Sequence, residues 1–252
     1  MDMIARTHQL SLELFCKVND FRELYRAYSW RSDNWSSGFI DILRLEKQVY
    51  SHDRENGITL DDVKDIAKWG MLPNPDLIEG SDRVLAPNTF YDNFGSLKPQ
   101  IKSGPIAPLI DLRKNIFKGI GPTYFSKILR FAAPRVYGAI DTRLVRVFGK
   151  GDDSKQLHDW LDLEVNLNDT GTSWFIPKWQ EQWPSGYKRW LDILQTFSLM
   201  LPADCPHLDA FVEHGLRDKG VWTCADVEMA LFTYASKRID NSGIKLGQDQ
   251  GR

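Results

Sequence analysis

Apolar residues recur at helical spacing along most of the chain. Intervals of three and four residues place them on one face of a helix, with charged residues on the opposite face. The pattern predicts helices at 4–18, 40–49, 59–69, 191–201, 207–217 and 226–237, the last with an apolar and a polar face. No convincing β-hairpin signal interrupts this pattern. We therefore predict an all-α fold.

Capping residues, glycines and prolines locate some of the helix ends. Thr59 precedes two acids and an apolar run, as a hydroxyl N-cap does, and Gly70 and the prolines after it end that helix. Residues 71–105 are rich in Pro, Asn, Asp and Gly, which predicts a connection with one short helix near Tyr91. Helices are expected to resume at about residue 106 and to continue, with short breaks, to about residue 149.

This pattern divides the chain into segments. We expect an N-terminal helical part, a central helical segment, C-terminal helices and a frayed tail. Their boundaries are 1–105, 106–150, 151–240 and 241–252.

Composition places the chain among ordinary globular proteins. Its 252 residues are 42% hydrophobic and 26% charged, with a formal net charge of −2, which excludes disorder as the main state. Cys16, Cys205 and Cys224 are too few and too scattered for a disulfide framework or a structural metal site. No secretory leader or membrane-spanning run is visible. We expect a cytoplasmic, nucleoid-associated protein with no membrane partner.

The small net charge hides two opposed regions. Residues 113–150 hold nine Lys and Arg and a single acid, a charge of +8, so the rest of the chain carries −10. Clustered bases are typical of phosphate binding, although a solvated helical face would also be charged. The segment therefore predicts a nucleic-acid partner.

A glycine turn lies inside this basic segment. The run 116–122 (IFKGIGP) predicts the end of one helix, a tight turn and the start of a second helix at Pro122. Free N–H groups at a helix start bind anions such as a DNA phosphate. The same turn is found in ordinary helical hairpins, so this signal alone is weak.

Asp141 is the acid of the basic segment. It stands between an apolar entry and the helix that begins at Thr142, which is an N-cap position. One interpretation is that its carboxylate only caps the helix. The other is that a carboxylate in cationic surroundings is kept ionised for catalysis. A single carboxylate can serve both purposes.

The turn and the aspartate together are more specific. The Gly-Ile-Gly turn at 119–121, the helix after it and the segment 139–146 (AIDTRLVR) resemble the helix-hairpin-helix DNA glycosylase superfamily. Twenty positions separate Gly121 from Asp141, as is usual in that family. The likeness covers about 35 residues. The segments 125–131 and 222–235 look most like the 8-oxoguanine-glycosylase-like proteins of archaea and bacteria. The resemblance implies a two-lobed, all-α glycosylase fold.

The resemblance also implies roles for individual residues. Asp141 would be the catalytic carboxylate, and the turn would hold a DNA phosphate, with a monovalent cation as the one cofactor it could take. Bifunctional members carry a Lys where this chain has Thr123, so the resemblance implies a monofunctional enzyme. Lys127, one turn later, is an alternative amine that would add lyase activity. The expected backbone-binding residues are Lys118, Gly119, Ile120, Gly121, Thr123, Arg130, Arg143 and Arg146.

A glycosylase must also hold a flipped base between flat side chains. Tryptophans near the turn-rich region 170–180, polar residues on either side of Pro206 and residues beside the hairpin are candidates, although core packing is the plainer interpretation of each. The candidates are Tyr124, Ser126, Trp174, Trp179, Asp204 and His207, with Asp209 beside the last two.

The resulting expectation is a monomeric enzyme that binds double-stranded DNA, flips a modified base and hydrolyses its N-glycosidic bond, leaving an abasic site. The base is 8-oxoguanine in a repair enzyme, or a hypermodified base such as a modified cytosine in antiphage defence. The alternatives are a non-catalytic DNA-binding protein with the same hairpin and, more weakly, a protein-interaction domain.

Overall fold

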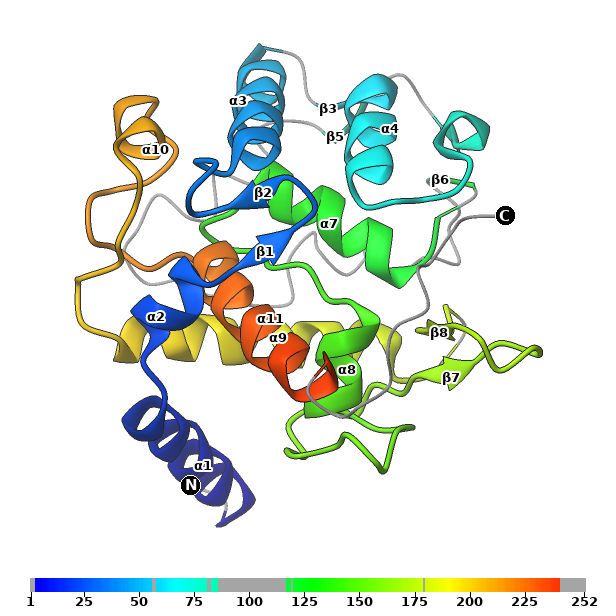
Figure 1. Ribbon diagram of the computed structural model, residues 1–252. Coiled ribbons are helices and arrows are strands. Elements are labelled where there is room, and N and C mark those ends of the chain that lie inside the picture. The colour runs from blue at the N-terminus through cyan, green and yellow to red at the C-terminus, as the bar shows by residue number, and fades with distance from the viewer. Residues whose placement is uncertain are drawn as a thin grey trace.

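The computed structural model describes residues 3–55, 58–80, 83–85, 117–118, 120–178 and 180–240 of the chain (Figure 1). These residues are mainly helical, which confirms the predicted class. The helices are α1 (Met3–Val18), α2 (Phe21–Arg26), α3 (Ile40–Glu55), α4 (Leu60–Trp69), α7 (Pro122–Ala132), α8 (Thr142–Phe148), α9 (Trp183–Met200), α10 (Asp209–Glu213) and α11 (Cys224–Asp240), with a 3₁₀ turn at Pro75–Leu77.

Among the described residues, four short antiparallel ladders lie between the helices. They pair β1 (Ser29–Trp30) with β2 (Asp33–Asn34), β3 (Ile58–Thr59) with β5 (Arg83–Leu85), β4 (Glu79–Gly80) with β6 (Phe117–Lys118), and β7 (Asn166–Leu167) with β8 (Trp174–Phe175). Two of these ladders are hairpins that the sequence pattern missed, because strands of two residues are too short to show alternation. Our interpretation of Phe117 and Lys118 as a helix end is also wrong, since they pair with β4.

Local chemistry sets several helix starts. The Thr59 hydroxyl accepts the N–H of Asp62, which confirms the predicted N-cap of α4. The Asp62 carboxylate accepts the N–H of Thr59 in return, which completes a capping box that was not predicted. Asp20 caps α2 in a similar way. Gly70 ends α4 at the expected position. The expected helices near Tyr91 and at 106–116, and the expected frayed tail, lie outside the described residues.

The helix α11 is the centre of the fold. Every residue from 224 to 235 is buried, so the predicted exposed polar face is wrong. The helices α2, α8 and α9 pack against it, which places the N-terminal α2 beside the C-terminal helix (Figure 1). Acidic side chains on a helix buried on all sides need partners inside the protein. Asp226 and Glu228 of α11 are such acids.

The helix α7 lies between two groups of helices. It packs against α3 and α4, and in Figure 1 the helices α8 and α11 lie on its other side. Residues from both groups form one continuous apolar core, so the helices that meet at α7 are not separated by solvent-filled space.

Several helix lengths differ from the sequence pattern. The helix α9 begins at Trp183, eight residues before the predicted start, because Trp183 and Tyr187 add two buried turns. The helix α10 spans five residues, so the predicted helix at 207–217 is too long. Within the described residues no helix is long and apolar enough to cross a membrane, and the three cysteines are free thiols.

Candidate functional site

The segment that leads into Asp141 is fixed by side chains from two other helices. The hydroxyl of Tyr187 donates to the carbonyl oxygen of Gly138 at 3.1 Å, and the indole Nε1 of Trp190 donates to that of Ala139 at 2.9 Å. From α7, the Ser126 hydroxyl accepts the N–H of Ile140 at 3.0 Å. The backbone before Asp141 is therefore held in one conformation.

Asp141 caps α8 with one of its two carboxylate oxygens. Its Oδ1 accepts the N–H of Leu144 at 3.0 Å, and the side chain is half-buried. Among the described residues no group donates a hydrogen bond to Oδ2. The capping interpretation is confirmed, and it leaves one oxygen available for chemistry.

Lys127 lies inside a cage of aromatic rings. Its Nζ is 5.1 Å from the ring centre of Trp30, 5.4 Å from that of Trp69 and 5.2 Å from that of Tyr124. The residue is 6% exposed. Within the described ranges Nζ forms no hydrogen bond and no ion pair. A lysine amine enclosed in this way has ring faces as its main contacts.

The two tryptophans of the cage are fixed in turn. The Trp69 Nε1 donates to Oδ2 of the buried Asp33 at 2.7 Å, and the Trp30 Nε1 donates to the carbonyl oxygen of Trp69 at 3.2 Å. Gly70 completes the wall, since a Cβ there would lie 3.0 Å from the lysine Nζ. The absence of a side chain at Gly70 makes room for the amine.

Burial is the main influence on the charge of this amine. It lowers the pKa of Lys127, and the carboxylates of Asp141 and Glu228 oppose that shift. A buried amine with a lowered pKa is a stronger nucleophile near neutral pH than a surface lysine. Burial also raises the pKa of the Tyr124 hydroxyl to about 12, so that cage residue stays uncharged. The negative charge of Asp141 at the start of α8 thus favours the charged form of Lys127, while burial disfavours it.

Two predicted binding residues are structural instead. Arg130 is 1% exposed, and its Nη1 donates to Oε1 of Glu46 at 2.7 Å, so it cannot contact a DNA phosphate. Ser126 is fully buried and holds the backbone before Asp141, so it cannot contact a base. Both side chains point into the core because α7 is covered by neighbouring helices along most of its length.

The hairpin residues are described in part. Gly119 lies outside the described residues, and Lys118 belongs to β6. Gly121 is the N-cap of α7, with open space where a Cβ would be, and Pro122 takes the first helical position as predicted. Ile120 is buried. Thr123, in the first turn of α7, is half-buried. Their contacts with DNA stay predictions.

Two arginines of α8 have partners within the protein. The Arg146 Nε donates to Asp152 at 2.6 Å, and its guanidinium lies 4.8 Å from the ring centre of Trp174. Arg143 donates to the hydroxyl of Ser236 at 3.0 Å. Arg146 is therefore already neutralised, and Trp174 stacks on an arginine rather than standing free. Trp179 lies outside the described residues.

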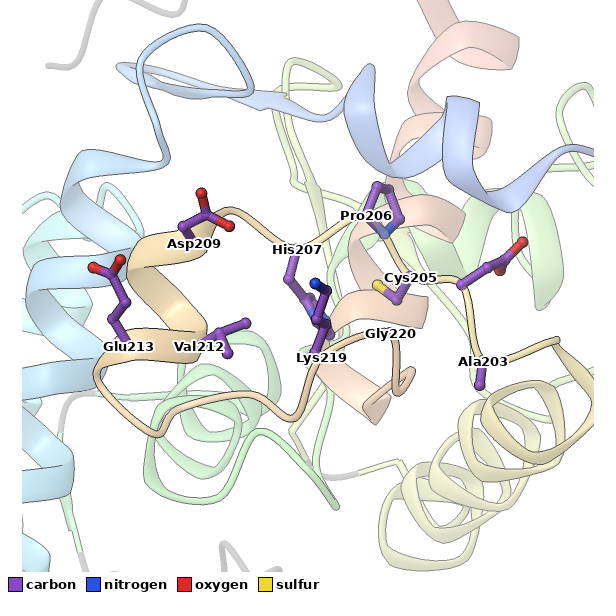
Figure 2. Close-up of a pocket in the computed structure, with 10 residues that line it drawn as sticks. Ala203, Cys205, Pro206, His207, Asp209, Val212, Glu213, Lys219 and Gly220 are labelled. Carbon is purple, nitrogen blue, oxygen red and sulfur yellow. The ribbon is translucent and has the colours of Figure 1, made fainter.

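The polar candidates on either side of Pro206 line a separate cavity of about 460 Å³ (Figure 2). Asp204, His207 and Asp209 are all in its wall, so the structure brings these three predicted residues together. Neither Asp141 nor Lys127 lines it. The His207 Nε2 is 3.0 Å from Oδ2 of Asp226, and its Nδ1 is buried without a hydrogen-bond partner in the described structure.

Cys205, His207 and Asp226 bring potential metal-ligating atoms within 4.8 Å of one another. Burial raises the pKa of the Cys205 thiol well above its usual value, which disfavours the thiolate that a metal requires. The Asp226 carboxylate already accepts hydrogen bonds from Arg217 and Thr223. These residues therefore fit a structural hydrogen-bond cluster better than a metal centre.

A chain of buried ionic contacts connects this cavity with the surroundings of Lys127. Arg217 binds Asp226 at 2.9 Å and Glu46 at 2.7 Å, and Glu46 also binds Arg130. Burial opposes ionisation of Asp226, but Arg217, His207 and Thr223 together hold the pKa of its carboxyl well below the usual range. Each residue in this series contacts the next, in the order His207, Asp226, Arg217, Glu46, Arg130 and Glu228.

The sequence pattern did not identify Glu46, Glu228 or the tryptophan cage as parts of this region. For Glu228 a signal existed, namely an acid inside the apolar run 224–235. Trp30 and Trp69 are 39 positions apart, so only the fold could bring them together.

A scan of protein-family models, a search of curated proteins and a search of solved structures found no match to this chain.

Proposed function

We propose that the protein is a DNA glycosylase that flips a modified base out of duplex DNA and cleaves its N-glycosidic bond. The observation that carries the proposal is the pair of reactive groups at α7 and α8: the Lys127 amine, which lies among aromatic rings without an ion pair in the described residues, and the Asp141 carboxylate, which uses one oxygen for its cap. The helix-hairpin-helix-like spacing of Gly121 and Asp141 in the sequence supports the same assignment.

Asp141 is the catalytic carboxylate of this proposal. Breaking the bond between C1′ and the base nitrogen leaves its electron pair on the base, which takes up a proton, and builds positive charge on the sugar. The unpartnered Oδ2 of Asp141 would stabilise that charge, or would accept the proton of the attacking water. The products are the free base and an abasic site.

Lys127 would supply a second activity. Because Lys127 is 6% exposed, the aromatic rings around it must move apart before its neutral amine can add to C1′ of the sugar. Loss of the base followed by ring opening then gives an imine between the lysine and the sugar. Proton loss from C2′ then expels the 3′ phosphate and breaks the strand. The protein would then be a glycosylase with lyase activity, acting as a monomer on chromosomal or invading DNA in the cytoplasm.

The first prediction concerns Asp141. Duplexes that each carry one modified base are incubated with the protein, and the released bases are identified by mass spectrometry. Asp141→Asn should reduce release by about 10²–10⁴-fold, because the amide cannot carry the negative charge. Released 8-oxoguanine would indicate repair, and a released modified cytosine would indicate antiphage defence.

Equal rates for the wild type and Asp141→Asn would refute the role of Asp141. Salt-sensitive DNA binding without release of any base would favour the non-catalytic DNA-binding alternative instead. A matched control is Asp153→Asn, which changes an exposed aspartate in the same way and should leave the release rate unchanged.

A further inference from the structure

Glu228 is a buried carboxylate to which the proposed reaction assigns no role. It lies on α11 directly against the segment before Asp141, since a Cβ on Gly138 would be 2.9 Å from the Glu228 Cβ. The backbone N–H of Ala139 faces its carboxylate and lowers the pKa of Glu228, against the effect of burial. On its other side, Oε2 is 3.9 Å from Nε of Arg130. Glu228 thus lies between the Asp141 segment and α7.

This position puts Glu228 on the side of α7 that carries the amine. Arg130 follows Lys127 by three residues, so the two side chains share one face of the helix. Arg130 already binds Glu46 at 2.7 Å and therefore cannot neutralise Glu228 alone. Lys127 is the other cation that acts on this carboxylate.

We propose that Glu228 is a positioning residue that controls the proton on Lys127. When Glu228 is ionised, it holds the lysine as an ammonium ion. When Glu228 is protonated and therefore neutral, the Lys127 amine more readily becomes a free nucleophile for the C1′ aldehyde of an abasic site. This inference rests on the proposed function, because it assigns regulation to the same site.

The charges around the pair support this assignment. Burial raises the pKa of Glu228 to about 8, which Asp141 reinforces and Arg130 and Lys127 oppose. Burial lowers the pKa of Lys127. Both shifts therefore disfavour the charged form of the pair inside the protein, whereas the lysine of a surface pair would stay charged. The ionisable groups that face Glu228 are Lys127 and Arg130 of α7, Asp141 at the start of α8, Tyr28 after α2, and Tyr187 of α9.

The second prediction uses DNA with a preformed abasic site, so that no base has to be recognised. The amine and the aldehyde form an imine and release water, and cyanoborohydride then delivers a hydride that reduces the imine to a stable adduct. Adduct yield is measured from pH 5 to 9.5, and peptide mass spectrometry locates the modified lysine. Lys127→Met should abolish the adduct.

Glu228→Gln should move the midpoint of this pH profile about one pH unit lower. The reason is that loss of the carboxylate removes an anion that keeps Lys127 protonated. Glu228→Asp keeps the charge and should retain the midpoint of the wild type. Glu181→Gln makes the same substitution at an exposed position and should also retain it.

An unchanged midpoint in Glu228→Gln, with a lower yield only, would show a merely structural role and overturn the inference. If that variant does not fold, the chemical shift of the Lys127 ε-carbon in the wild type is followed by NMR as the pH is varied, and the number of titration steps tests the inference. Two steps, one from each group, support the inference, and a single step contradicts it.

Failure of this inference and failure of the proposed function are distinguishable. If the wild type releases a base but gives no adduct, the proposed glycosylase function is supported. The same result refutes the inference that Glu228 controls Lys127 as a nucleophile. An adduct that depends on Glu228, without release of any tested base, would support the control of the amine and count against the glycosylase.

Discussion

His158 shows how one side chain ties stability to pH. Its ring stacks on Phe148, with ring centres 5.3 Å apart, and its Nε2 is 3.2 Å from the hydroxyl of Tyr234. Burial, followed by the charge of Arg238, lowers the pKa of His158 to about 4. Below pH 6.5, His158 binds a proton in the unfolded chain, whereas in the folded protein it stays neutral until the pH approaches 4. Stability from this residue is therefore complete above pH 6.5 and is lost as the pH falls to about 4.

The third prediction is that the free energy of unfolding of the wild type falls by about 1–2 kcal/mol between pH 6.5 and 4 because of His158. The value allows for the partial solvent exposure of the ring. His158→Phe keeps an aromatic ring but cannot titrate, so it should show a smaller fall over the same range. Urea unfolding at several pH values measures this, and parallel pH profiles for the two proteins would contradict the assignment.

At the scale of the element, α8 begins at the residue proposed for catalysis. Asp141 gives one oxygen to the N–H of Leu144, and this helix has only seven residues. Asparagine also caps helices well, whereas alanine does not. The two substitutions therefore separate the stability of α8 from the chemistry of Asp141.

The fourth prediction is that Asp141→Ala lowers the free energy of unfolding by about 1 kcal/mol, while Asp141→Asn stays within about 0.3 kcal/mol of the wild type. Both should lose base release to a similar extent. Denaturant unfolding and the release assay give the two readouts. If the two variants are equally stable, the cap contributes nothing to stability; if Asp141→Asn keeps full activity, the residue acts only as a cap.

Over the whole molecule, a buried ionic network crosses the centre of the fold. Glu46 of α3 binds both Arg130 of α7 and Arg217, and all three side chains are about 1% exposed. Removing one member of such a network leaves charges buried without a partner, which costs far more than breaking a surface pair. The network therefore makes the packing of α3 against α7 depend on one glutamate.

The fifth prediction is that Glu46→Gln lowers the free energy of unfolding by about 3–5 kcal/mol. The exposed pair Arg135–Asp218 provides the comparison, because its side chains are 53% and 59% exposed. Arg135→Gln should change stability by less than about 1 kcal/mol. Thermal or denaturant unfolding measures both, and similar losses in the two variants would contradict the role given to the network.

The sequence by itself determined the local features of this protein. The helical class, the N-cap at Thr59, the start of α7 at Pro122 and the cap at Asp141 follow from residues within one or two turns. Helix starts and ends depend on nearby hydrogen bonds and backbone preferences, so neighbouring residues are enough to locate them.

Only the tertiary structure decided where the charges of the basic segment 113–150 go. Arg130 lies in the core, and Arg135, Arg146 and Lys150 pair with Asp218, Asp152 and Asp162, all outside that segment. It likewise decided that Lys127 lies among aromatic rings, with Glu228 on the neighbouring α11. The physical reason is that charge interactions and burial depend on distance in space, and a sum along the chain contains no information about partners from distant helices.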